Sequence, residues 1–166
     1  MVSKEGSGHI AVLGCAYITV TESKAMAYLV VGDEDWTLDH NCKVLGKAAD
    51  GEQDQLIPIV GFDPGTLLIG EQLTTGDGSI APVEYLAEIL YQLQERGLAS
   101  NVTRIDFSDP DAVKFSYGRK YTVILGSYSE VEYKFGMFVS VMEKLKAGDV
   151  GIINLSDTST AHFSPN

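Results

Sequence analysis

Basic residues are scarce in this chain of 166 residues, which has 12 Lys and Arg against 23 Asp and Glu. The formal net charge is −11 at pH 7. A protein that binds the phosphate backbone of nucleic acid needs Lys and Arg to release the condensed counterions. The composition therefore argues against a nucleic-acid partner and favours a basic or neutral one.

Cysteine and histidine are also few. Cys15 and Cys42 are the two cysteines and no CxxC pair exists, which excludes a disulfide framework but leaves open one bridge or two free thiols. His40 and Cys42 form a lone HxC pair, whereas zinc takes about four ligands, so we predict no metal site. An enzyme that brings Cys42 to His162 in space is a further hypothesis, and it requires a cleft and a thiol with a lowered pKa.

The sequence has no run of about 20 apolar residues, as a membrane-spanning helix would need, and no signal-peptide pattern. It also lacks the GxSxG, HExxH, P-loop and GxGxxG motifs. The residues alone therefore show no visible active site and no cofactor motif. The polar opening MVSKEGSGH predicts that residues 1–14 are a flexible leader outside the fold, of the kind that an expression tag adds.

Apolar residues make up 45% of the chain, with 8 Tyr, 6 Phe and 1 Trp, which is enough for a core. Alternating and β-rich runs predict strands. The run LIPIV at 56–60 contains a proline, which predicts an edge strand or no strand. We expect the other strands at 16–22, 25–31, 36–40, 42–45, 102–107, 112–117 and 121–125.

Two amphipathic helices are expected between these strands. In the first, Pro82 fits an opening turn, Leu86, Ile89, Leu90 and Leu93 form one apolar stripe, and Gly97 ends the helix. The second follows Ser129 and Glu132, whose spacing is that of a capping box. The order of elements predicts an α+β fold, a mainly antiparallel β-sheet with two helices packed on it.

The final segment, GIINLSDTSTAHFSP, alternates apolar and polar residues in two short runs around a turn. This pattern predicts two strands, each with one buried face. No later sequence is at hand to cover the last strand. An open edge of this kind either carries protection against aggregation or pairs with another chain, and we expect pairing.

Several short phrases, taken in order, resemble the FtsQ/DivIB family of bacterial cell-division proteins. ITVTESKAMAYLV resembles the strand and hinge between the POTRA and β subdomains, WTLDHNCKVL the next hairpin, and LIPIVGFDP a later segment. The second helix carries the family's Lys-Phe pair as Lys134 and Phe135, and the final segment resembles the family's ending. Asn41-Cys42 and Asn154 depart from the family pattern, in which Asp-Gly and Asp are common.

The resemblance implies three parts: a leader at 1–14, the last strand of a truncated POTRA domain with its hinge at 15–24, and a β domain at 25–166. It implies a non-enzymatic divisome scaffold without a cofactor, on the extracellular face of the cell membrane at the septum and anchored by a segment absent here. The expected partners are FtsB/DivIC-like and FtsL-like division proteins, bound by strand addition at the C-terminal edge. By position, the partner-binding residues would be Asn154, Ser156, Asp157, Thr158, Thr160, Ala161 and Phe163.

Two other predictions accompany this one. An unpaired edge could also pair with a second copy of the chain. The alternative function is a small-ligand or ion-binding extracellular domain that uses the Gly-rich loop at 61–78 and nearby acids. That alternative requires a deep pocket with convergent polar groups.

Overall fold

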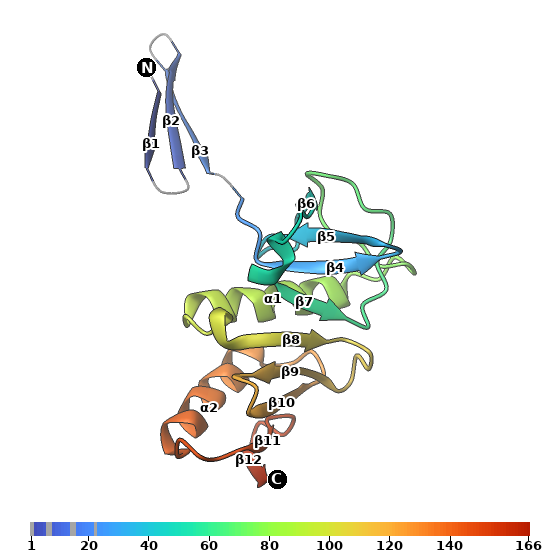
Figure 1. Ribbon diagram of the computed structural model, residues 1–166, viewed down its shortest axis with the longest axis vertical. Helices are drawn as coiled ribbons and strands as arrows, with labels where there is room; N and C mark the ends of the chain where they lie inside the picture. Colours follow the sequence, from blue (N-terminus) through green and yellow to red (C-terminus); the bar gives the residue numbers. More distant parts are fainter. Residues whose placement is uncertain (1, 6–7, 14–15, 22) are drawn as a thin grey trace.

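The computed structural model describes residues 2–5, 8–13, 16–21 and 23–166, with side chains from residue 23 on (Figure 1). In chain order its strands and helices are β1 (Val2–Glu5), β2 (Gly8–Leu13), β3 (Ala16–Thr21), β4 (Ala27–Val31), β5 (Glu34–Leu38), β6 (Val44–Lys47), η1 (Glu52–Gln55), β7 (Ile57–Val60), α1 (Ala81–Glu95), η2 (Ala99–Asn101), β8 (Val102–Asp106), β9 (Val113–Tyr117), β10 (Tyr121–Gly126), α2 (Val131–Lys144), β11 (Gly151–Asn154) and β12 (His162–Pro165).

Nine strands form one mixed sheet in the order β12-β11-β10-β9-β8-β7-β4-β5-β6. The β4–β7, β7–β8 and β10–β11 pairs are parallel, and the other five pairs are antiparallel. Both α-helices lie behind the strands of this sheet in Figure 1. The predicted α+β architecture, with a mostly antiparallel sheet and two helices, is therefore confirmed at this level.

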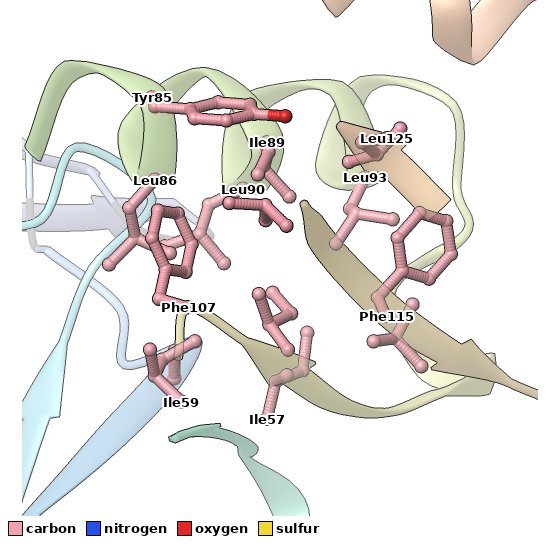
Figure 2. Packing of buried hydrophobic residues seen from close by; sticks show 14 of the residues in the cluster. Ile57, Ile59, Tyr85, Leu86, Ile89, Leu90, Leu93, Phe107, Phe115 and Leu125 are labelled. Carbon is pink, nitrogen blue, oxygen red and sulfur yellow. The ribbon is translucent and has the colours of Figure 1, made fainter. Parts of the chain in front are cut away.

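The core lies between the sheet and the helices. The predicted stripe of α1, Leu86, Ile89, Leu90 and Leu93, is fully buried. Figure 2 shows these side chains above those of the sheet, with Phe115 at one end. Phe115 stacks on Phe135 of α2, with ring centroids 5.7 Å apart. Burial of each large side chain contributes about 1.5–3 kcal/mol, so packing on the sheet is what stabilises both helices.

Strand β7 corrects one prediction, because the run with the proline is a central strand rather than an edge. It lies between β4 and β8 and is parallel to both. The backbone N–H of Ile57 donates to Met26 on the β4 side, so the missing N–H of Pro58 would face β8. Pairing with β8 begins only at Ile59. The proline therefore removes no hydrogen bond of the ladder.

The N-terminal residues differ from the expected leader. Strands β1 and β2 fall within residues 1–14, and β2 pairs antiparallel with both β1 and β3 in a separate three-stranded sheet. The β-prone run of residues 10–13 supplies part of that pairing. The assignment of β3 to a POTRA remnant stays a prediction. Among the described residues, no helix has the length and apolar character needed to cross a membrane.

The start of α2 corrects the expected capping box. Glu130 occupies the N-cap position in the left-handed region, with φ of 48°, and no side chain caps the helix. Lys134 is fully buried, and its Nζ donates to the Ser127 carbonyl at 3.0 Å and to Ser129 Oγ at 3.4 Å. Ser129 therefore accepts from a lysine of the second turn instead of capping the first. Burial lowers the pKa of Lys134.

Candidate functional site

Strand β12 forms one edge of the nine-stranded sheet, and within the described part of the chain no strand pairs with its outer side. It runs antiparallel to β11, with Ile153 opposite Phe163 and Ile152 opposite Ser164. The N–H of Asn166 donates to Val150, which extends this ladder by one pair. Because alternate residues of an antiparallel strand point their backbone groups to opposite sides, Phe163 directs its N–H and C=O outward.

Pro165 and Gly151 are the residues that allow β12 to pair closely with β11. Pro165 has the same outward parity as Phe163, so its missing N–H costs no bond to β11. Gly151 lies opposite Pro165, where a Cβ would come within 2.9 Å of the Pro165 Cα and overlap the Ser164 carbonyl oxygen. Only glycine lets the two strands approach this closely.

Two consecutive side-chain turns connect β11 to β12. Asn154 Oδ1 accepts from Ser156 N at 2.9 Å and from Ser156 Oγ at 2.6 Å. Asp157 Oδ1 accepts from Ser159 N at 2.8 Å and from Ser159 Oγ at 2.6 Å. These hydrogen bonds lower the pKa of Asp157 below its usual 3.8. The Oδ1 atoms of Asn154 and Asp157 are therefore occupied in holding the turn.

A groove of about 970 Å³ runs between α2 and the segment that leads into β12. Met137, Val141 and Leu145 contribute one partly buried apolar wall, and Ala161 and Phe163 the other. Phe163 also packs edge-on against the ring of Tyr121, at 6.3 Å between centroids. The core thus opens to solvent beside the open strand, and we call this space the edge groove.

Charged and aromatic side chains border the edge groove. Arg96, Glu132 and Lys144 are among its lining residues, and Tyr133 is 58% exposed there. The guanidinium of Arg96 donates to the Glu132 carbonyl at 3.3 Å, which ties the end of α1 to α2. An apolar floor with a mixed-charge rim suits a peptide better than a small polar ligand.

The seven residues predicted to bind a partner fall into two groups. Thr160, Ala161 and Phe163 line the edge groove, whereas Asn154, Ser156, Asp157 and Thr158 belong to β11 and the turn. Sequence reasoning missed the contribution of α2. Its signal was present, because Tyr133, Met137 and Val141 recur every four residues as a second apolar stripe beside the buried one.

The cysteine hypothesis is contradicted by the structure. Cys42 is fully buried, and burial followed by the charge of Asp39 raises the pKa of its thiol, the opposite of what a nucleophile needs. Cys42 precedes β6, and His162 lies on β12 at the other end of the sheet. Cys42 is a free thiol, while Cys15 lies outside the described residues. No three His, Cys, Asp or Glu of the described residues converge on a metal position, at His40 or elsewhere.

The Gly-rich loop at 61–78 borders a cleft of about 190 Å³ that includes Phe62, Asp63, Asp77 and Phe107. Ligand pockets are usually about 300–1,000 Å³. Asp77 Oδ1 accepts from Ser79 and Thr75, which lowers the pKa of Asp77 to about 2. This cleft is below that range, but a second groove of about 430 Å³ is lined by residues 72–75 and 78 of the same loop, so the ligand-binding alternative stays a prediction.

No protein-family model matches this chain, and no curated protein matches it. Among solved structures, the chain is similar to the major extracytoplasmic domain of the trans isomer of the bacterial cell division protein DivIB from Geobacillus stearothermophilus. The two are 16% identical, the similarity covers 76% of this chain and 100% of that chain, and the TM-score is 0.42.

Proposed function

We propose that this chain is a scaffold domain of the bacterial division machinery, without enzymatic activity, that binds a partner protein by strand addition at β12. The observation that carries the proposal is the open β12 edge beside the edge groove. An added strand gains affinity from main-chain hydrogen bonds and specificity from alternate side chains. In this proposal the β12 edge supplies the main-chain hydrogen bonds, and the edge groove contacts the alternate side chains of the partner.

The backbone of β12 limits where the partner strand pairs. Phe163 directs both a donor and an acceptor outward, whereas Pro165 offers only its carbonyl. The partner strand is therefore expected to centre on Phe163 and to extend toward Ala161. Each hydrogen bond of this kind contributes about 0.5–1.5 kcal/mol net, so pairing alone gives modest affinity.

The edge groove would supply the remaining affinity. Side chains of directly paired residues on neighbouring strands lie about 4.5–5.5 Å apart. The residue opposite Phe163 would point to the helix side of the sheet, over Met137 and Val141. We therefore expect a large apolar residue at that position of the partner, with polar residues before and after it.

The resemblance of the sequence to the FtsQ/DivIB family supports the identity of the partner. It favours the extracellular segments of FtsB/DivIC-like and FtsL-like proteins, on the outer side of the membrane at the septum. In this proposal a membrane anchor belongs to a part of the protein outside this sequence. A second copy of the chain, paired edge to edge at β12, is the competing occupant of the same surface.

Two variants at one position test strand addition. Phe163→Ala removes the ring from the edge groove, while Phe163→Pro removes both the ring and the outward N–H. We expect the proline variant to bind the extracellular segment of the cognate FtsB/DivIC-like protein about five to ten times more weakly than the alanine variant. Isothermal titration calorimetry measures both affinities, and circular dichroism checks that both variants fold.

Equal affinities of the two variants would contradict strand addition while keeping a role for the ring. Absence of binding by the unsubstituted chain would contradict the proposed partner class. Sedimentation of the chain alone tests whether a second copy occupies the β12 edge. Edge-to-edge pairing would give a dimer that Phe163→Pro dissociates.

A further inference from the structure

A second groove, of about 430 Å³, lies far from β12 in the sheet order, between the first half of α1 and the loop before it. Leu73 and Val83 form its buried floor, and Ala87 lines it from α1. Ile80, at the N-cap of α1, also lines it and is 70% exposed. We call this space the α1 groove. Its volume is within the usual range for a binding pocket.

The segment that lines the α1 groove is acidic. From residue 48 to residue 95 the sequence has nine Asp and Glu and no Lys, Arg or His. Glu84 lines the groove directly. Asp77 is fixed beside it by Ser79, a lining residue, and like any exposed aspartate it is charged at neutral pH. Lys43, whose backbone bridges Gln72, is the basic residue that the strand pairing brings to this region.

The exposed side chain of Ile80, an apolar floor and carboxylates therefore occur together here. Burial raises the pKa of Tyr128, and the nearby charges of Glu84 and Glu88 raise it further. An isolated apolar groove would accept many occupants, but this charge selects among them. An anionic membrane surface would be repelled, and so would a second copy that presents the same face.

We propose that the α1 groove docks a basic segment of a partner protein, in which Lys or Arg alternates with large apolar side chains. The apolar side chains would fill the space between Ile80 and Ala87, and the cations would lie near Glu84 and Asp77. This site is separate from β12, so it does not depend on the function proposed above, and both partners could be bound at once.

Dye-labelled peptides and one matched pair of variants test the proposal. The probe is a peptide in which Lys and Leu alternate, compared with a Glu/Leu and a Lys/Ser peptide. Ile80→Ser removes the apolar side chain at the groove and places a favourable residue at the N-cap of α1, so the fold is retained. Ile69→Ser is the control, because Ile69 is 68% exposed in the same acidic segment but lies against Gly46 of β6.

We expect Ile80→Ser to weaken binding of the Lys/Leu peptide about tenfold and Ile69→Ser to weaken it less than twofold, as measured by fluorescence anisotropy. Binding should also weaken as salt is raised. A second pair of variants adds one positive charge to α1. Ala87→Arg places it inside the groove and should abolish binding, whereas Gln94→Arg places it outside and should not. Equal effects within either pair, or equal binding of the Lys/Ser peptide, would overturn the proposal, because charge alone would then explain the affinity.

Discussion

The two edge strands of the nine-stranded sheet, β6 and β12, differ in whether their outward backbone groups are hydrogen-bonded. At β6, the outward backbone groups of Val44 are satisfied, because its N–H donates to Glu71 and its carbonyl accepts from Gly70. Leu73 adds a bond to the Cys42 carbonyl. At β12, no described residue reaches the outward groups of Phe163. Among the described residues, the sheet's own loop thus covers the β6 edge at Val44, whereas the β12 edge stays unpaired, as the proposed strand addition requires.

The largest expected effect comes from opening the closed edge. Leu73 is 2% exposed and holds the covering loop against the sheet. We expect Leu73→Ala to lower the free energy of unfolding by about 3 kcal/mol, because it leaves a cavity in the core. The loosened loop should also make the chain self-associate at β6, which sedimentation would detect. A variant that loses this stability but remains monomeric would show that the loop does not protect the edge.

A smaller effect is expected from displacing the open edge. Gly151→Ala places a methyl group against the backbone of Ser164 and Pro165, which should cost about 2 kcal/mol and detach β12. Hydrogen exchange at the amides of His162 and Ser164 would report the detachment. Gly136→Ala is the control, since a Cβ meets nothing within 4 Å there and alanine favours the helix. Unchanged protection in Gly151→Ala would mean that β12 adjusts without detaching.

The smallest effect concerns the turn beside the open edge. The pKa of Asp157 is lowered in the folded chain, so its charge stabilises the turn above pH 3.8 and this contribution is lost as the pH falls through the folded pKa. We expect the Ser159 amide resonance to shift on acidification below pH 3.8, and Asp157→Asn to abolish the shift. An identical titration in the asparagine variant would point to a carboxyl group other than Asp157.

Periodicity was sufficient to predict the parts of the fold that have one buried face. The stripe from Leu86 to Leu93 and the alternation around Ile153 both have the expected burial. The local pattern wrongly predicted an edge strand or no strand around Pro58. Whether a proline is tolerated in a central strand depends on which neighbouring strand its missing N–H would face. The local pattern also missed the wall that Met137 and Val141 contribute to the edge groove, since that requires knowing that α2 lies next to the segment before β12.

The sequence by itself determined both α-helices, most strands of the large sheet and the faces that they bury, because these depend on residues a few positions apart. Only the tertiary structure decided which strands lie at the edges, since the β4–β7 and β10–β11 pairs join segments distant in the chain. It alone placed a loop over β6, a groove beside β12 and carboxylates around Ile80. Those arrangements result from packing between distant segments, which no local pattern encodes.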